Sequence, residues 1–354
     1  MIERARSLAT ELSPHRISHA THRRLDPDVA DALRADGLVD CLAPRELGAA
    51  ELAPHDYVAV LEALATGDPA AAWVTMTAST SSVLAVYLPR DTARAMWAER
   101  PFLAGVFAPG GKLVGDRLTG RWSYASGCQH ADWFVMGALV ERDGKPRHVV
   151  CAVLARDVQI IDTWNPLGLH GTGSHDVTID AAVPASHVTS VFERAPWSEA
   201  PLYRVPLFGL LAIGIAAVGL GIARGALDGL AGGFRDAPPA LLASYAVQRA
   251  RLDAARAYLV ATAQATVATA TAGPVDGPSR GQLRLAASHV AHECAAIARA
   301  IFHATGGPAV HRDHPAQLSL RDLETVLTHR MVSERIQVAA ARAVLGIGTI
   351  APDL

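Results

Sequence analysis

The chain has 354 residues, half of them hydrophobic, which exceeds what one hydrophobic core usually organises and predicts two or three sub-domains. The formal net charge of −2 excludes a strongly basic surface of the kind that binds nucleic acid or anionic membranes. Four scattered cysteines without a Cys-x-x-Cys pair favour a reduced, cytoplasmic protein over a disulfide scaffold. The charged N-terminal residues include no apolar run, so no signal peptide is expected.

The first hundred residues carry a helical pattern and are interpreted as an N-terminal helical domain (1–100). Asp26 and Pro27, followed by Val29, Leu33 and Leu38, predict a capped amphipathic helix. Further helices are expected over residues 54–64, 69–88 and 91–99.

Residues 101–195 change to the short alternating or fully apolar runs that are typical of strands. Strands are expected over residues 103–107, 112–118, 120–125, 133–140, 148–154 and 177–183. Gly110 and Gly111 are expected to form the turn between the first two. Trp122, Tyr124 and Ser126 alternate with their neighbours, so these three are expected on one face of a strand. The region is predicted to be a small β-barrel or sandwich.

Residues 196–354 return to long helices, predicted over 240–272, 280–304 and 319–345, and are interpreted as a C-terminal four-helix bundle. The apolar segment 205–223 is long enough to cross a bilayer. It stands alone and lacks a positive-inside pattern, so a buried central helix is favoured. The predicted fold class is therefore α+β, mostly α, with the β domain between two helical domains.

Three motifs then occur in a distinctive order. The first runs from Trp122 to Trp133 (WSYASGCQHADW), the second covers residues 164–174 (WNPLGLHGTGS), and the third combines Gly306-Gly307, Arg321-Asp322 and His329. Together with the order helices, β domain, helices, they resemble the acyl-CoA dehydrogenase superfamily and, within it, the branch of two-component flavin-dependent monooxygenases.

The resemblance implies an enzyme that hydroxylates a small aromatic or biosynthetic intermediate through a C4a-hydroperoxyflavin. It implies reduced flavin (FADH2 or FMNH2) as cofactor, molecular oxygen as co-substrate and a separate flavin reductase as partner. It also implies a homotetramer or homodimer, with no nucleic-acid or membrane partner. The fold expected from the resemblance is acyl-CoA dehydrogenase-like.

The resemblance also assigns site residues. Ser126 and His329 would be catalytic: the hydroxyl would lie near flavin N5, and the imidazole would act as a base or hydrogen-bond the peroxide. The residues expected to bind the cofactor are Trp122, Tyr124, Ser126, Gly127, Gly171, Thr172, Gly173, Ser174 and Arg249. The residues expected to contact the substrate are His130, Trp133 and Cys128. An ordinary strand-end serine at Ser126, a structural His130 and a packing role for Cys128 remain alternative interpretations.

Two departures from the family pattern matter. Acyl-CoA dehydrogenases proper carry a glutamate base where this chain has Thr328-His329-Arg330, which argues against ordinary dehydrogenation. Leu318 replaces an arginine of the monooxygenase branch, which puts one phosphate or interface contact in question. A flavin-dependent acyl-CoA dehydrogenase-type oxidoreductase and a non-catalytic member of the fold are the alternative functions.

The fifteen histidines raise the question of a metal. His311, His314 and His329 are candidate ligands, but their spacing matches no metal motif and no acidic cluster supports them. The sequence therefore predicts no metal site.

Overall fold

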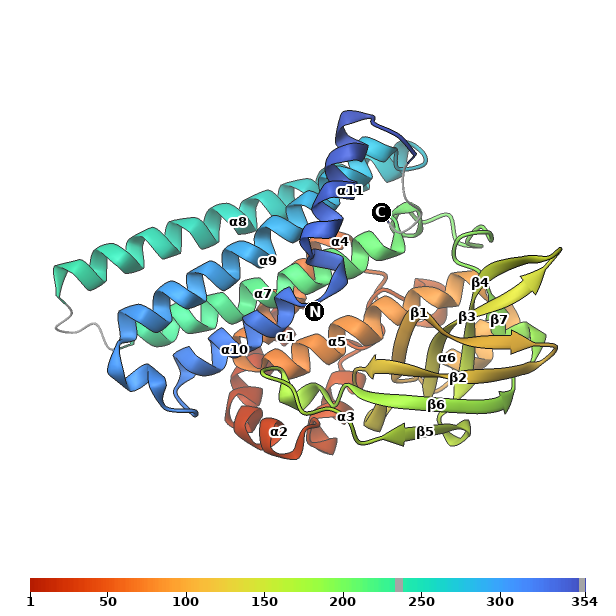
Figure 1. Ribbon diagram of the computed structural model, residues 1–354, viewed down its shortest axis with the longest axis horizontal. Coiled ribbons are helices and arrows are strands. Elements are labelled where there is room, and N and C mark those ends of the chain that lie inside the picture. The colour runs from red at the N-terminus through yellow and green to blue at the C-terminus, as the bar shows by residue number, and fades with distance from the viewer. Residues whose placement is uncertain (233–237, 350–353) are drawn as a thin grey trace.

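The computed structural model describes residues 1–232, 238–349 and 354 and consists of helices around one sheet (Figure 1). The helices before the sheet are α1 (Ile2–Leu12), α2 (Arg16–His22), α3 (Pro27–Ala35), α4 (Pro54–Gly67), α5 (Pro69–Ser82) and α6 (Arg90–Trp97). The strands are β1 (Leu103–Val114), β2 (Arg117–Ala125), β3 (Trp133–Arg142), β4 (Lys145–Leu154), β5 (Val158–Ile161), β6 (His175–Ala182) and β7 (Val188–Thr189). The helices after it are α7 (Leu207–Ala231), α8 (Pro239–Ala272), α9 (Gly277–Thr305), α10 (Pro315–Leu327) and α11 (Glu334–Leu345).

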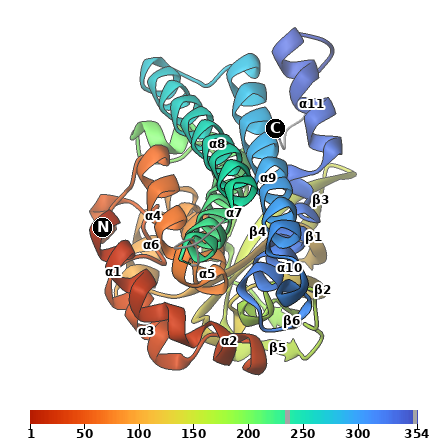
Figure 2. The ribbon, with the colours of Figure 1, turned by 90° about the vertical axis from the view of Figure 1, so that its left-hand side faces the viewer.

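The observed order of helices, sheet and helices confirms the predicted fold class. In Figure 2, α1 and α4 lie to the left of α7, α9 lies to its right and α8 lies above it. The division at about residues 100 and 195 stays a prediction.

Helix α7 is the central helix of the molecule. By length and composition alone it could cross a membrane, but 78% of its most apolar window is buried inside the chain, as expected for a core helix. Its glycines bring neighbouring helices close: a Cβ at Gly221 would lie 2.3 Å from the Glu62 carbonyl oxygen of α4, and one at Gly214 would lie 2.7 Å from Met76 Cγ of α5.

The strands form one sheet in the order β5-β6-β2-β1-β3-β4-β7, in which only the β1–β3 pair among the described strands is parallel. Buried side chains from both halves of this order, such as Val177 of β6 and Val149 of β4, belong to one core with Trp122. The sheet therefore curls around its own apolar centre, in agreement with the predicted barrel or sandwich.

Two predicted strands are in fact one. Strand β1 runs through Gly110 and Gly111, and its register against β3 shifts between Val106 and Gly111. The glycine pair therefore lies within a strand and is not a turn. Its lack of side chains makes room for the Trp122 indole. A Cβ at Gly110 would lie 2.6 Å from Trp122 Cδ1, and one at Gly111 would lie 2.5 Å from Trp122 Cζ2. The turn lies instead at Gly115, whose φ is +62°.

The predicted helix over 319–345 is also wrong, since α10 ends at Leu327 and α11 starts at Glu334. A short 3₁₀ turn, Arg330–Val332, lies between them. Groups of α9 satisfy the carbonyls of this break: Arg284 donates to the Met331 carbonyl at 3.3 Å, and the Ser288 hydroxyl donates to the Val332 carbonyl at 2.8 Å. Tertiary hydrogen bonds thus replace the helical ones.

Helix α3 begins at Pro27, as predicted, but Asp26 does not cap it through its side chain. The carboxylate accepts a hydrogen bond from Ser18 Oγ at 3.2 Å and pairs with His15 Nδ1 at 2.9 Å instead. A prediction based on helix-capping preference therefore missed a tertiary role for this residue.

Candidate active site

A β-bulge near the end of strand β2 changes the direction in which its last side chains point. The pairing of β2 with β6 is interrupted between Trp122 and Ala125, and Tyr124 adopts a left-handed φ of 67°. The bulge shifts the alternation, so that Trp122 and Ala125 are buried while Tyr124 is 70% exposed. The predicted common face for Trp122, Tyr124 and Ser126 is therefore wrong. The extra residue instead brings Ser126 to the inner side of the molecule, where it is buried.

Ser126 lies where β2, helix α5 and the segment around the 3₁₀ turn His170–Thr172 meet. Its Oγ accepts a hydrogen bond from Trp73 Nε1 of α5 at 3.1 Å. It also lies 2.7 Å from Ser174 Oγ, which in turn lies 2.7 Å from Thr172 Oγ1. Four side chains from three parts of the chain thus form one continuous hydrogen-bonded row.

The direction of this row follows from its end. Thr172 donates to the Leu169 carbonyl oxygen at 2.9 Å, and a carbonyl can only accept. Because each hydroxyl has a single hydrogen, Ser174 must donate to Thr172, and Ser126 must donate to Ser174. The indole N–H fills one lone pair of Ser126 Oγ. The row therefore leaves Ser126 with one lone pair that can accept a further hydrogen bond.

His329 contacts this row through Trp73, with ring centroids 5.8 Å apart in an edge-on arrangement. It stands in the break between α10 and α11, where its Nδ1 accepts from the Met331 amide at 3.2 Å. Burial, with a smaller contribution from Arg284, lowers the pKa of His329 to about 4. The ring is therefore neutral near pH 7, and its hydrogen resides on Nε2.

The segment 168–174 packs against helices α2 and α10. Asp322 accepts from the Leu169 amide at 2.7 Å and pairs with Arg16 of α2 at 2.9 Å, so the Arg-Asp motif anchors this segment. A Cβ at Gly171 would lie 2.7 Å from His19 Cβ, so only glycine permits this approach. A pocket of about 190 Å³ opens beside the segment; its lining includes Asp68, His170, Arg312, Leu318 and Arg321.

Trp122 requires a correction. It is 1% exposed, and its Nε1 donates to the Gly137 carbonyl at 2.7 Å inside the core of the sheet. Its side chain therefore cannot line a flavin pocket. Tyr124, in contrast, is exposed and makes an edge contact with Trp164 at 6.2 Å, which leaves two aromatic rings together at the surface end of β2.

The three residues expected to contact substrate each pack against other groups of the protein. Cys128 is buried, donates to the Gly173 carbonyl at 3.3 Å and has its pKa raised to about 12 by burial, so it ties two loops together. His130 packs on Phe102 at 6.0 Å, and burial lowers its pKa to about 4. Trp133 packs on His187 at 5.2 Å, at the start of β3.

Arg249, like Trp122, is an expected cofactor residue that lies away from the row. It lies on α8 and pairs with Asp253 of the same helix at 2.8 Å. The remaining expected glycines do lie beside the row: Gly127 donates its amide to the Thr172 carbonyl at 2.8 Å, and Gly173 has a left-handed φ of 52°.

The sequence interpretation missed Trp73. Asp68 and Pro69 predict the start of a helix there, and Asp68 indeed caps α5 through the amides of Ala70 and Ala71. Capping signals do not tell which side of a buried helix faces a loop some fifty residues away in the chain, so no local pattern marked Trp73 as a partner of Ser126.

These residues fit a reduced flavin. The central ring of reduced flavin carries an N–H donor at N5, and the row presents an open acceptor at Ser126 Oγ. A Cβ at Gly127 would lie 2.8 Å from Val74 Cγ1, and one at Gly173 would lie 2.7 Å from Gln129 Oε1, so these glycines permit close packing around the row. A dry site formed by Trp73 and the partly buried His329 suits chemistry that water would divert.

Comparisons with known proteins support this interpretation. The family described as "Acyl-CoA dehydrogenase, C-terminal domain" matches residues 213–334. The indole-3-acetate monooxygenase of Pseudomonas putida is 30% identical over 331 residues, which cover 88% of this chain and 85% of that protein.

Solved structures agree. The 3-HSA hydroxylase of Rhodococcus sp. RHA1 superposes with a TM-score of 0.91 at 25% identity, over 98% of this chain and 97% of that one. XiaF from Streptomyces, solved with FADH2 and glycerol, has the same fold, with a TM-score of 0.91 at 24% identity over 100% and 96%. The chain therefore belongs to the two-component flavin-dependent monooxygenases of the acyl-CoA dehydrogenase superfamily, and it is an enzyme that uses reduced flavin and molecular oxygen.

Proposed function

We propose that the hydrogen-bonded row that includes Ser126 is the part of the active site that receives the reduced flavin. The observation that carries this proposal is the one-way order of its hydrogen bonds, from Trp73 through Ser126 and Ser174 to Thr172. Ser126 would accept the hydrogen bond of flavin N5–H, and the backbone at Gly127 and Gly173, next to the row, would lie beside the ring. Tyr124 would flank it at the surface end of β2.

The bound flavin supplies the two electrons that activate oxygen, so that one oxygen atom can enter the substrate. The protein's own part is to keep the N5 proton in place. Because the hydrogen of Ser126 is committed to Ser174, Ser126 holds this proton as an acceptor and does not supply a competing one. The site must also exclude water, which the buried Trp73 and the apolar faces of α5 and α7 favour.

We propose that His329 acts as a hydrogen-bond donor and not as a base. Its Nδ1 is occupied by the Met331 amide, and its low pKa keeps the ring neutral, so the free group is Nε2–H. A neutral donor at this place stabilises negative charge on oxygen without delivering a proton too early. This choice narrows the two roles that the family resemblance left open.

For the substrate we propose a small aromatic compound. Two relatives, from Pseudomonas putida and Acinetobacter baumannii, are named indole-3-acetate monooxygenases and cover 88% and 87% of this chain. A third, from Rhizobium, is named a resorcinol hydroxylase oxygenase component and covers 49%. Indole-3-acetate and resorcinol are therefore the first compounds to test.

The oxygenase works with a separate flavin reductase, and we further propose that it is a homotetramer or homodimer in the cytoplasm. Support for the oligomer comes from exposed apolar side chains on α8 and α11, including Leu242, Val247, Val338 and Leu345. An oligomer that covers α8 would also explain why Arg249 lies away from the site of its own chain. The four cysteines are buried free thiols, as suits a reducing compartment.

The test is a coupled assay with a flavin reductase, NADH, oxygen and either FMN or FAD. With indole-3-acetate or resorcinol, the enzyme should form a hydroxylated product with little hydrogen peroxide, and Ser126→Ala should release hydrogen peroxide instead of product. Loss of one hydrogen bond at a buried site weakens the interaction by about 1–3 kcal/mol, or roughly 5–150-fold.

The matched control is Ser123→Ala, which removes an exposed hydroxyl from the same strand and should keep wild-type coupling. Equal coupling in wild type and Ser126→Ala would contradict the role of Ser126. Hydroxylation of neither compound would contradict the proposed substrates. Light scattering on the purified protein tests the oligomer, and a monomeric mass would contradict it.

A further inference from the structure

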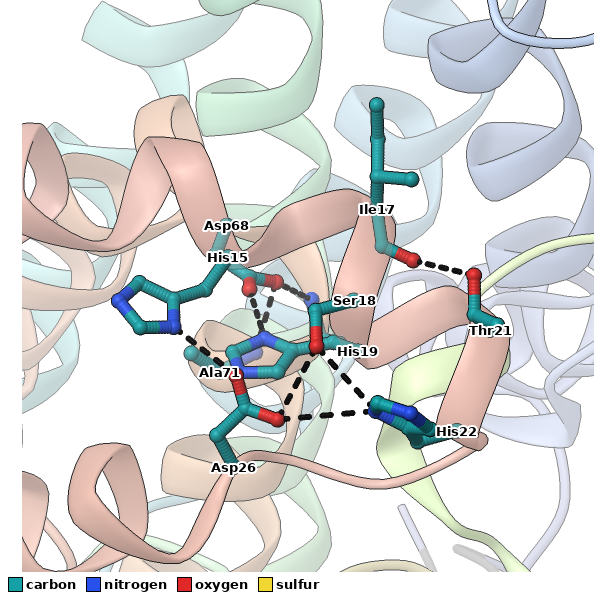
Figure 3. Close-up of polar contacts among 10 residues, drawn as sticks. His15, Ile17, Ser18, His19, Thr21, His22, Asp26, Asp68 and Ala71 are labelled. Atoms are coloured by element: carbon teal, nitrogen blue, oxygen red, sulfur yellow. Dashed lines mark hydrogen bonds and ion pairs between the residues drawn. The ribbon is translucent and has the colours of Figure 1, made fainter.

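A second cluster of chemically active side chains lies below the proposed flavin segment. His15 ends the 3₁₀ turn Ser13–His15 just before α2, His19 lies one turn further on within α2, and Asp26 stands just before α3 (Figure 3). One ligand atom from each, His15 Nδ1, His19 Nε2 and an Asp26 carboxylate oxygen, converge: all three lie within 4.8 Å of one another. The sequence interpretation predicted no metal site, and its metal test considered only histidines in the C-terminal third.

The state of His19 is set by a second carboxylate. Its Nδ1 makes a short contact with Asp68, whose other oxygen caps α5 through the amides of Ala70 at 2.7 Å and Ala71 at 3.2 Å. The capped carboxylate accepts the Nδ1 hydrogen, so the neutral ring carries its lone pair on Nε2. Histidines that bind metals commonly donate their other N–H to a carboxylate in this way.

The lone pair of His19 Nε2 is without a partner. The side chain is 1% exposed, and among the described residues this nitrogen makes no hydrogen bond. Its nearest ligand-type neighbour is Asp26 Oδ2, at 3.6 Å. A buried acceptor without a donor is unfavourable by about 1–3 kcal/mol, so a ligand at this point would relieve a real deficit.

We propose that His15, His19 and Asp26 bind one divalent transition-metal ion of the zinc type. Bonds of about 2.1 Å in tetrahedral geometry place ligand atoms about 3.4 Å apart. The observed separations from Asp26 Oδ2, 2.9 Å to His15 Nδ1 and 3.6 Å to His19 Nε2, lie on either side of this value. Two imidazoles and one carboxylate are a donor set that such ions accept.

The fourth position is open to water or to His22. His22 Nδ1 lies 3.8 Å from the other oxygen of Asp26, and its side chain is 59% exposed, so it can rotate toward the ion. His15 now donates its Nδ1 hydrogen to Asp26, whose pKa this contact lowers. The metal ion would take the place of the hydrogen that His15 Nδ1 shares with Asp26. A neutral His15 ring would move this hydrogen to Nε2, and a protonated ring would release it to solvent.

Binding would connect two helices and the loop above them. The ion would join α2 to the residue that precedes α3, and His19 is the side chain on which Gly171 packs. The site would thus stiffen the support of segment 168–174. The proposal is independent of the flavin assignment, because it stands on contacts of the N-terminal helices alone.

The experiment uses the full-length protein after dialysis against a chelator. Titration with Co²⁺, followed by its visible absorption, should show saturable binding of one equivalent, and Zn²⁺ should displace it. Zn²⁺ should also raise the Tm. His15→Ala and Asp26→Asn, at partly exposed positions that tolerate substitution, should abolish both effects. Asp68→Asn keeps a capping oxygen and should weaken binding roughly 10–100-fold.

His311→Ala, at an exposed histidine before α10, is the control and should bind like wild type. The proposal is overturned if wild type binds no more Co²⁺ or Zn²⁺ than His15→Ala. The cluster would then be a network of hydrogen bonds and ion pairs among these side chains that holds no metal.

Discussion

Two buried histidine sites in this chain differ in what surrounds them. His329 lies in a break between helices, with Trp73 beside it and a backbone amide on its Nδ1, and burial drives its pKa down to about 4. His19 is more deeply buried, yet it lies between the carboxylates of Asp68 and Asp26.

The difference shows that burial alone does not decide what a histidine can do. Without a carboxylate, burial leaves a neutral ring whose N–H can serve as a donor. With a carboxylate on one nitrogen, the other nitrogen becomes a lone pair that suits a metal ion. In our proposals, the group that binds one ring nitrogen therefore decides whether the other nitrogen donates a hydrogen bond, as in His329, or binds a metal ion, as in His19.

The largest effect is expected where the carboxylate is removed. Asp68→Ala should destabilise the protein by roughly 3–5 kcal/mol, because it leaves His19 without its buried partner and α5 without its cap. Urea denaturation measures the change. A loss below about 1 kcal/mol, the size of a surface pair, would mean that the His19 contact contributes little.

The next effect concerns pH. A histidine with a folded pKa near 4 resists protonation, whereas the unfolded chain takes up the proton near pH 6.5. The stability it contributes is therefore present above pH 6.5 and is lost as pH falls toward 4. His329→Gln should therefore reduce the drop in the free energy of unfolding between pH 6.5 and 4 by at most about 3 kcal/mol. The pKa of His130 is lowered in the same way, so the variant should still lose the stability that depends on His130 as the pH falls.

Denaturation curves at pH 4.5 and 7.5 measure this change. Turnover tests the same state of His329: because the ring stays neutral above about pH 5, it should cause no acid limb in kcat between pH 6 and 8. An unchanged pH dependence of stability in His329→Gln would contradict the low pKa.

A smaller effect should appear where the two regions touch. Gly171→Ala places a Cβ 2.7 Å from His19 Cβ and 3.0 Å from Ala70 Cβ, so it should cost about 1–3 kcal/mol of stability by overpacking. It should also weaken reduced-flavin binding. The control is Gly229→Ala on α7, where the added methyl meets nothing within 4 Å and should stabilise by up to about 1 kcal/mol.

If Gly171→Ala left stability and flavin affinity unchanged, the segment 168–174 would have more freedom than its packing on α2 indicates. Thermal denaturation and anaerobic flavin titration give the two measurements.

The smallest effect is expected for Trp73→Phe. The ring remains, but the N–H that fills one lone pair of Ser126 Oγ is lost, so this hydroxyl is positioned less firmly, while the direction of the row stays fixed by Thr172. We expect the affinity for reduced flavin to fall by about 1 kcal/mol, or roughly fivefold, which is a smaller loss than for Ser126→Ala. Anaerobic titration measures it, and a loss equal to that of Ser126→Ala would mean that Trp73 holds the flavin directly.

Much of the architecture was predictable because it rests on local patterns. The period of apolar residues marked the helical thirds and the strands between them, and the uninterrupted apolar segment marked the central helix α7. The family resemblance, rather than a local pattern, assigned both Ser126 and residues 171–174 to the flavin; in the structure their hydroxyls form one row. The helices and strands depend on the types of neighbouring residues, which the chain itself displays.

The errors arose where distant groups decide the outcome. The final helix breaks because Arg284 and Ser288 of α9 bind its carbonyls, which releases His329 from a helical position. Trp122 was assigned to a flavin pocket, but the glycines of β1 accommodate it in the core. No local pattern in the last helix or in β2 reveals these partners.

The sequence by itself determined the class of the protein, the order of its domains and the residue types available for flavin chemistry, since periodicity and motifs are properties of consecutive residues. Only the tertiary structure decided which side chains meet. It turned the carboxylate of Asp26 from a helix cap to His15, and it ordered the hydroxyls so that Ser126 accepts. The physical reason is that a hydrogen bond or a metal ligand needs two groups within about 3 Å, and chain order does not specify that distance for residues far apart.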